Sequence, residues 1–343
     1  MTDGGGQLLV GFDLGTSWSA VMTNRGHKEL VRSVVGYPRD MIGIKLLGKP
    51  HVVGNEAFDM RSYVDLRCPL NGGVLQEYVE RDLEVARHFV GHVIDSLNPQ
   101  PEDEVCVIAG VPARASNTNK DLLLQVFREF VDIAQVISEP FLVAYGQGTL
   151  INCMVIDIGA GSVDICALKG AMPGVKSQIT VNKAGNFVDE QLEAAITEVY
   201  PDVQMNTYIA RALKEGNGFL GTPEKQITVN LRANGKPVSY DVTDIVRSAC
   251  ETLMPGIIEG VESLIQTCPP EGQEDMLKNI FVAGGGSRIK GIDRYIADKL
   301  KDYGEVSVTC VGDPIYGLSV GALKLAQELP PSNWEQLGSM TDY

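Results

Sequence analysis

Two segments of the sequence share residue types that suit a phosphate group and a divalent cation. Asp13 ends an apolar run and precedes residues 14–17 (LGTS), and Asp157 ends a similar run and precedes residues 158–162 (IGAGS). Glycines let backbone N–H groups approach an anion closely, and hydroxyls add donors. Mg²⁺ prefers a few carboxylates, retained waters and phosphate oxygens. Either segment alone is also typical of a structural hairpin, but the second copy favours a clamp around a polyphosphate.

A third glycine-rich segment follows a predicted strand. Residues 281–283 (FVA) lead into Gly284, Gly285, Gly286 and Ser287, and a helix is predicted over residues 289–300. Such a turn leaves a flat backbone surface beside a helix N-terminus, which suits an adenosine and its nearest phosphates. No Gly-Lys-Ser/Thr follows, as a Walker loop requires, and no Gly-x-Gly-x-x-Gly opens a first βαβ unit.

Glu139 is the remaining candidate for chemistry. It stands at the end of a predicted strand and directly before Pro140, which opens a helix. A carboxylate at the mouth of an interdomain cleft can orient or deprotonate an attacking water, an effect of about 10²–10⁴-fold. A negative charge at this place also stabilises a helix through the helix dipole. The residues alone leave both interpretations open.

The elements that position these residues repeat along the chain. Residues 8–21 (LLVGFDLGTSWSAV) and 154–168 (MVIDIGAGSVDICAL) both consist of an apolar strand, an Asp, a glycine turn and a second strand. The two copies lie nearly half the chain apart. Repetition on this scale predicts two similar domains that face each other.

Strands alternate with helices over most of the chain, which predicts an α/β fold with helices on the faces of its sheets. Residues 105–111 form a continuous apolar run typical of a strand buried on both sides. Residues 81–97 have helical periodicity. We predict one long helix over residues 245–264 and a small irregular insertion over residues 33–73.

Length and charge exclude some classes of partner. The 343 residues suggest two domains, and 44 Asp and Glu against 29 Lys and Arg give a net charge of −15. This excess of acidic residues disfavours binding to nucleic acids and to anionic membranes. The N-terminus has no basic region of a signal peptide, and the longest uncharged run, residues 140–156, is too short and polar to cross a membrane. The seven cysteines form no CxxC pair. We expect a soluble cytoplasmic protein with reduced cysteines and no direct membrane insertion.

Five motifs occur in the order found in the actin, sugar-kinase and heat-shock-chaperone ATPase superfamily. GFDLGTS and VIDIGAGSVDI resemble its phosphate motifs, SEPFLVAYG and GLSVGALKLA its connecting motifs, and VAGGGSRIKGI its adenosine motif. The resemblance implies an actin-like, ribonuclease H-like fold with the nucleotide between two opposed domains. It implies that domain I covers residues 1–150, contains an insertion at about 33–75 and is completed by a helix at 314–328. Domain II would cover residues 151–313 and contain an insertion at about 200–244. Residues 329–343 would form a C-terminal tail.

The same resemblance implies a role for each matching residue. The cofactors would be ATP or ADP and Mg²⁺, with the cation held through water by Asp13 and Asp157. Glu139 and Asp157 would form the catalytic pair that positions or activates the attacking water. The nucleotide itself would contact loop and helix residues of both domains, namely Gly15, Thr16, Ser17, Gly159, Ala160, Gly161, Asp189, Lys214, Gly284, Gly285 and Ser287.

Within this superfamily the residues favour a filament-forming bacterial actin. Only residues 329–343 follow the last predicted helix, too few for a chaperone's substrate domain. The histidines form no cluster like the metal motifs of the smaller sugar kinases; His88 and His92 are four residues apart on a helix, without a third ligand in view. A small-molecule kinase of the same fold remains the alternative. A filament subunit with damaged catalysis is disfavoured, because Asp13, Glu139 and Asp157 are all present.

Residues 33–67 and 328–338 carry a narrower resemblance, to the magnetosome-associated actin-like proteins of magnetotactic bacteria. It implies self-association into cytoplasmic filaments that organise and position magnetosome chains, with magnetosome-associated adaptor proteins as partners. The glycine-rich N-terminus, in which Asp3 is the single charge before Gln7, argues against a membrane-binding amphipathic helix.

Overall fold

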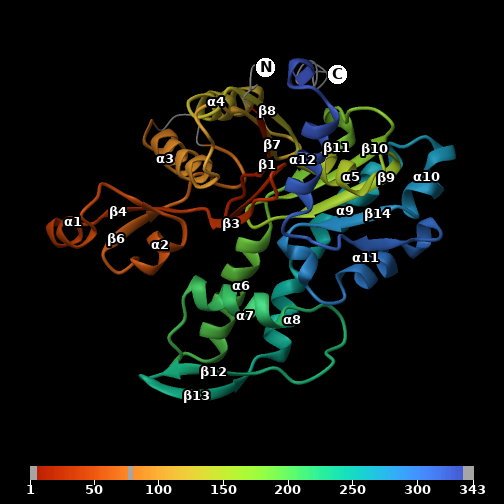
Figure 1. The fold of residues 1–343 in the computed structure, drawn as a ribbon. Coiled ribbons are helices and arrows are strands. Elements are labelled where there is room, and N and C mark those ends of the chain that lie inside the picture. The colour runs from red at the N-terminus through yellow and green to blue at the C-terminus, as the bar shows by residue number, and fades with distance from the viewer. Residues whose placement is uncertain (1–5, 76–79, 335–343) are drawn as a thin grey trace.

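The computed structural model describes residues 6–75 and 80–334, so part of the predicted tail lies outside the described residues. Two five-stranded sheets with the same topology dominate it (Figure 1). The first has the order β3-β2-β1-β7-β8, with β1 (Gln7–Asp13), β2 (Trp18–Thr23), β3 (Lys28–Arg32), β7 (Glu104–Val111) and β8 (Ile133–Ser138). The second has the order β11-β10-β9-β14-β15, with β9 (Ile151–Ile158), β10 (Val163–Lys169), β11 (Gln178–Val181), β14 (Ile280–Ala283) and β15 (Val308–Cys310).

Strand pairing is repeated as well. In each sheet three antiparallel strands are followed by two strands parallel to the first. Asp13 of β1 lies opposite Ala20 of β2, and Asp157 of β9 lies opposite Asp164 of β10. The strand–turn–strand repeat predicted from residues 8–21 and 154–168 is therefore present, and both aspartates lie at the carboxyl ends of central strands, where open α/β sheets bind ligands.

Two helices fill the space between the sheets. Side chains of α5 (Glu139–Gln147) and α12 (Gly317–Glu328) form one core with the inner faces of both sheets. Along β1, Leu9 faces this central layer while Val10 and Phe12 face the outside of the first sheet. This alternation explains the continuous apolar strands, because both faces of each sheet are covered.

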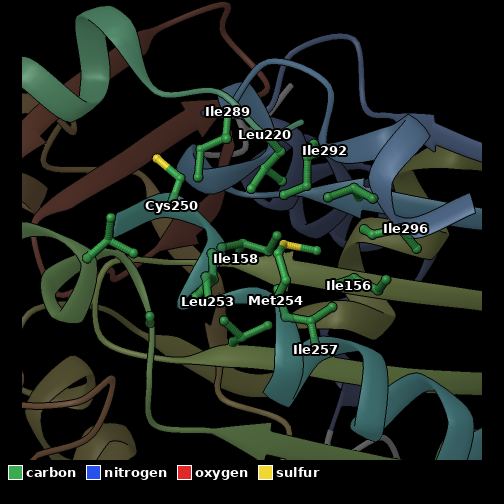
Figure 2. Packing of buried hydrophobic residues seen from close by; sticks show 14 of the residues in the cluster. Ile156, Ile158, Leu220, Cys250, Leu253, Met254, Ile257, Ile289, Ile292 and Ile296 are labelled. Atoms are coloured by element: carbon green, nitrogen blue, oxygen red, sulfur yellow. The ribbon is translucent and has the colours of Figure 1, made fainter. Parts of the chain in front are cut away.

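Further helices cover the outer faces of the two sheets. The first sheet is covered by α3 (Glu80–Ser96) and α4 (Asn117–Arg128), and Phe12 meets Phe127 edge-on with ring centroids 5.2 Å apart. The second is covered by α9 (Met254–Gln266), α10 (Pro270–Leu277) and α11 (Ile292–Leu300). Figure 2 shows Met254 and Ile257 of α9 packed beside Ile156 and Ile158 of β9.

The cysteines are free, as expected, and mostly buried. Cys106, Cys153 and Cys166 lie in the layer between the sheets. Burial raises the pKa of the Cys153 thiol to about 11, which keeps it protonated at neutral pH.

The predicted irregular insertion is an ordered lobe, which corrects the sequence interpretation. Strands β4 (Val35–Pro38), β5 (Val52–Val53) and β6 (Val64–Arg67) form a small antiparallel sheet with α1 (Met41–Leu47) and α2 (Gly54–Asp59). Its strands are too short for their alternation to stand out in the sequence. The Asp40 carboxylate caps α1 by accepting from the N–H groups of Ile42 and Gly43 at 2.8 and 2.9 Å.

A second lobe projects from the other half (green, bottom of Figure 1). It contains α6 (Gly185–Val199), α7 (Thr207–Asn217), α8 (Thr243–Glu251) and the hairpin β12 (Thr228–Ala233)–β13 (Lys236–Asp241). The single helix predicted over residues 245–264 is wrong, since α8 ends at Glu251 and α9 begins at Met254. Pro255 has no N–H to donate to the Glu251 carbonyl, and its ring would clash with that carbonyl in a continuous helix.

Candidate functional site

A cleft of about 350 Å³ lies between the two halves. Of the residues predicted to form a site, all but Asp189 and Ser287 line it: Asp13, Gly15, Thr16, Ser17, Glu139, Asp157, Gly159, Ala160, Gly161, Lys214, Gly284 and Gly285. Further wall residues were not predicted, among them Trp18, Leu30, Gly73, Arg211, Glu215, Leu253, Arg288, Ile289, Pro314 and Ile315. These residues come from widely separated parts of the chain, and no local motif connects them.

The two aspartate-containing loops face each other across the cleft. Thr16 of the first loop accepts a hydrogen bond from the N–H of Gly73 at 3.0 Å. Gly161 of the second loop lies so close that a Cβ there would overlap the Thr16 hydroxyl and stand 2.9 Å from the Gly73 nitrogen. Glycine is therefore required at 161 for the loops to approach each other this closely.

The second loop is also fixed against the start of α6. The N–H of Gly185 donates to the Gly159 carbonyl at 3.0 Å, and the N–H of Asn186 donates to the Ala160 carbonyl at 2.8 Å. Gly185 itself lines the cleft. The positive end of the α6 dipole thus lies beside this loop, which favours a negatively charged group there.

The floor of the cleft contains buried carboxyl groups that repel one another. Burial, with the nearby Asp157 charge, holds the pKa of Asp13 well above its usual range. Burial is also the main reason that the pKa of Glu139 is raised, followed by the charges of Asp164, Asp157 and Asp13. Burial and then Asp164 raise the pKa of Asp157 from 3.8 to about 7. Three of these acids were predicted from the sequence, and the structure brings them together.

Asp164 is the acid that sequence reasoning missed. It is 1% exposed and accepts from the hydroxyls of Ser162 and Thr180 at 2.8 and 2.6 Å. It also accepts from the N–H of Ala113, in the other half of the molecule, at 2.8 Å. A signal was present, because a carboxylate in the apolar strand VDICAL requires partners when buried. Asp164 ties the second loop to the loop after β7.

This donor set fits a hydrated divalent cation. Within residues 6–75 and 80–334, no three His, Cys, Asp or Glu side chains are arranged to ligate a metal directly. Mg²⁺ does not need such a cage, since it keeps several waters and takes one or two carboxylates plus phosphate oxygens. A positive charge beside Asp13 and Asp157 would offset the repulsion that raises their pKa values.

The opposite wall is a polar face of α7. Arg211, Lys214 and Glu215 line the cleft at the spacing that puts residues on one helical face. Asp189 does not line the cleft: it is fully buried behind this wall, where Arg211 and Lys214 pair with it at 2.9 and 2.7 Å. Lys214 also donates to the Gly185 carbonyl at 2.7 Å. Asp189 therefore positions the two positively charged side chains, Arg211 and Lys214, that line the cleft.

The glycine-rich turn after β14 completes the wall. Gly284 has a φ of 72°, and a Cβ there would overlap the Asp157 carboxylate. Both features require glycine. Ser287 is buried, and its hydroxyl donates to the Gly284 carbonyl at 2.8 Å. Ser287 thus supports the turn from behind, while Gly284 and Gly285 face the cleft.

Comparison with known proteins identifies the family of this chain. The MreB/Mbl protein family matches residues 7–331. The chain belongs to this family. It is 54% identical to the actin-like protein MamK of Paramagnetospirillum magneticum, over 99% of both chains, and 54% identical to MamK of Magnetospirillum gryphiswaldense, over 99% of this chain and 96% of that protein. It is 26% identical to the cell shape-determining protein MreB of Haemophilus influenzae, over 89% of each.

Solved structures show the same actin-like fold. A MamK double helical filament matches with a TM-score of 0.92 at 55% identity, covering 94% of this chain and 100% of that one. A non-polymerising MamK variant bound to AMPPNP matches with a TM-score of 0.75 at 54% identity, covering 94% and 99%. The predicted actin-like α/β fold is confirmed. In the described parts of this MreB/Mbl family member, no helix is long and apolar enough to span a bilayer.

Replacing Asp157 by Asn should change how the stability of the nucleotide-free, Mg²⁺-free protein depends on pH. An acid whose pKa rises from 3.8 to about 7 on folding binds its proton more tightly in the folded chain. The free energy of unfolding therefore falls as pH rises through this interval and levels off above pH 7. At pH 8 the Asp157→Asn variant should melt about 2 °C or more above the wild type, with the difference shrinking towards pH 4. Thermal melts from pH 4 to 8 measure this.

The exposed Asp121 on α4 supplies a matched control, because Asp121→Asn removes one acid outside the cleft. Its melting curve should follow the wild type. An Asp157→Asn variant that melts below the wild type at pH 8 would show that the carboxylate is stabilised in the cleft without a cation.

Proposed function

We propose that this protein is an ATP-binding and ATP-hydrolysing bacterial actin that polymerises into cytoplasmic filaments. The observation that carries the proposal is the full-length identity of 54% to MamK from two magnetotactic species. Solved structures of MamK include a double helical filament and an AMPPNP complex of a non-polymerising variant. An identity this high over 99% of both chains supports transfer of assembly and nucleotide binding to this chain.

The match to filament structures supports assembly. At nearly equal identity, the filament subunit gives a TM-score of 0.92 and the non-polymerising variant 0.75. A second MamK filament structure, at 6.5 Å, gives 0.85. The fold of this chain is thus more similar to the filament subunits than to the non-polymerising variant. ATP binding would favour the assembling form, and hydrolysis would favour disassembly.

The cleft supplies the groups that an ATPase needs. The loops at Gly15–Ser17 and Gly159–Gly161 would bind phosphates through backbone N–H groups and hydroxyls. Gly284, Gly285 and Lys214 would lie along the adenosine, with Asp189 and Ser287 holding that wall from behind. When bound, Mg²⁺ neutralises developing negative charge on the phosphates. Asp13 and Asp157 would hold its waters.

Glu139 is placed to act on water. It is the first residue of α5 and lies at the floor of the cleft beside Asp157. We assign it the role of orienting the attacking water and accepting its proton, with Asp157 helping to position that water. Because burial and the neighbouring acids raise the pKa of Glu139, positive charge beside it would have to favour its ionised form before it could accept a proton.

An apolar surface on the first lobe suits contact between subunits. The helix α1 exposes Met41, Ile42, Ile44 and Leu46, with exposed fractions of 79%, 66%, 54% and 60%. Adjacent exposed apolar side chains mark interaction surfaces on soluble proteins. We propose a second copy of this chain as the occupant, because the structures matched at above 50% identity include filaments. Head-to-tail contacts of this kind extend without closing.

The cellular role follows from the same relatives. We propose that the filaments organise and position magnetosome chains and bind magnetosome-associated adaptor proteins. We also assign domain I to residues 1–150, completed by helix 314–328, and domain II to residues 151–313. The proposed boundary falls in the short connection between α5 and β9. A small-molecule kinase is not favoured, because the family and the relatives at 41–54% identity are actin-like or MamK-like proteins.

Replacing Glu139 by Gln should separate binding from hydrolysis. Loss of the proton acceptor should slow phosphate release by about 10²–10⁴-fold. Gln keeps the size of the side chain, so ATP-dependent pelleting should persist. Phosphate release and pelleting are measured on the same samples, with Glu198→Gln, at an exposed site on α6, as the control. Unchanged phosphate release would remove Glu139 from the mechanism.

Replacing Ile42 by Asp should weaken assembly without affecting nucleotide binding. Burying a carboxylate at a subunit contact is costly, and a loss of about 1.4 kcal/mol corresponds to a tenfold rise in critical concentration. Sedimentation of increasing protein concentrations with Mg·ATP measures it. Ile151→Asp is a matched control, because Ile151 is equally exposed, at 66%, on the body of the protein. Equal effects of both changes would mean that α1 has no special part in assembly.

The kinase alternative makes a different prediction for turnover. A filament-forming ATPase shows a critical protein concentration, whereas a kinase shows turnover proportional to its concentration and dependent on an acceptor. ATP turnover against protein concentration, with electron micrographs of the same samples, distinguishes them. Linear turnover and no filaments at several salt concentrations would support the kinase.

A further inference from the structure

Two aromatic side chains join the small lobes across the outer end of the cleft. Phe58 of α2, in the first lobe, meets Tyr208 of α7, in the second, with ring centroids 5.2 Å apart and ring planes at 74°. This edge-to-face arrangement is one that aromatic pairs prefer. The two residues are far apart in sequence and belong to opposite halves of the molecule, so the contact exists only while the lobes are together.

Arg32, at the end of β3, connects this pair to the cleft. Its guanidinium lies 4.0 Å from the ring centroid of Phe58 and 4.3 Å from that of Trp18. Trp18 lines the cleft next to the first phosphate loop. Within the described residues, the buried Nε–H of Arg32 has no hydrogen-bond acceptor. The guanidinium thus contacts an aromatic ring from the cleft wall and one from the first lobe.

The other side of the contact also leads into the cleft wall. Tyr208 lies three residues before Arg211 on α7, so the two side chains are neighbours on one face of the helix. Arg211 and Lys214 of the same helix line the cleft and are fixed by the buried Asp189. A movement that separates Tyr208 from Phe58 would carry these cleft residues with it.

We propose that Trp18, Arg32, Phe58 and Tyr208 form a latch that holds the lobes closed over a bound nucleotide and limits the rate at which it leaves. The latch deepens the proposed function and rests on it, since it requires a nucleotide in the cleft. Tyr208 is 47% exposed, so its ring is not part of the core of its own lobe. The ring contacts link the two lobes, and none of these four residues belongs to the group of carboxyl side chains at the floor of the cleft.

The experiment measures release of a fluorescent ATP analogue, mant-ATP with Mg²⁺, after mixing with excess ATP. It uses full-length protein below the critical concentration, so that release from the monomer is observed. Phe58→Leu and Tyr208→Leu should each speed release about threefold to tenfold, the range expected for losing one aromatic pair. The double variant should be no faster than the faster single variant, because the second change finds the contact already broken.

Two controls separate the latch from other effects. Tyr208→Phe keeps the ring and should release mant-ATP at the wild-type rate. Tyr303→Leu removes an exposed aromatic ring outside the cleft and should do the same. If Phe58→Leu fails to fold, as judged by circular dichroism, the exposed Tyr208 position still tests the proposal.

The outcomes distinguish the latch from the function on which it rests. Wild-type protein that binds no mant-ATP would overturn both the proposed function and the latch. Wild-type protein that binds it, with unchanged release from both leucine variants, would overturn the latch alone. Rate increases that multiply in the double variant would show that the rings act independently, and would also overturn it. Equal acceleration in the two single variants and the double variant supports the latch.

Discussion

The burial of several carboxyl groups at one point constrains the rest of this structure. Asp13, Glu139 and Asp157 meet at the cleft floor, with Asp164 buried beside them. Burial raises the pKa of all four acids, and the charges of neighbouring acids raise it further for Asp13, Glu139 and Asp157. The folded chain without ligand therefore carries unfavourable electrostatic energy at neutral pH. Positive charge beside these acids would relieve it. In a protein with a net charge of −15, this local need would give an anionic nucleotide a route to binding through a cation.

Holding these acids together requires a rigid support. The central layer supplies it, because α5 and α12 pack against the inner faces of both sheets. Glu139 starts α5, while Asp13 and Asp157 end or nearly end the two central strands. The repeated sheet topology thus brings equivalent loops to one point, and each half supplies a glycine-containing loop and a carboxylate. Sites on strand and helix ends are held more precisely than sites on long loops.

The sequence predicted the parts of the site that lie in local motifs. Both aspartate loops, Glu139 and the glycine turn at Gly284 could be identified because strand, turn and helix signals surround them. Other parts depend on distant contacts. Asp164 could be suspected as a buried carboxylate, but its contact with Ala113 in the other half was not predictable. Asp189 was predicted as a nucleotide contact, whereas it acts from behind the wall through Arg211 and Lys214. The break between α8 and α9 could have been found, since Pro255 marks it. The first lobe was predicted as an insertion, but its regular structure was missed because its strands are only two to four residues long.

The two ends of the cleft differ in the strength of the contacts that join the halves. At the floor, the buried Asp164 accepts from Ala113, and Ser138 of β8 donates to Gln178 of β11 at 2.6 Å. Breaking such buried polar contacts leaves groups without partners, which is costly. At the mouth, the halves meet through the rings of Phe58 and Tyr208, and Tyr208 is already about half exposed to solvent, so separation costs less. Opening should therefore pivot at the floor and widen at the mouth, which lets a nucleotide leave while the carboxyl cluster stays assembled.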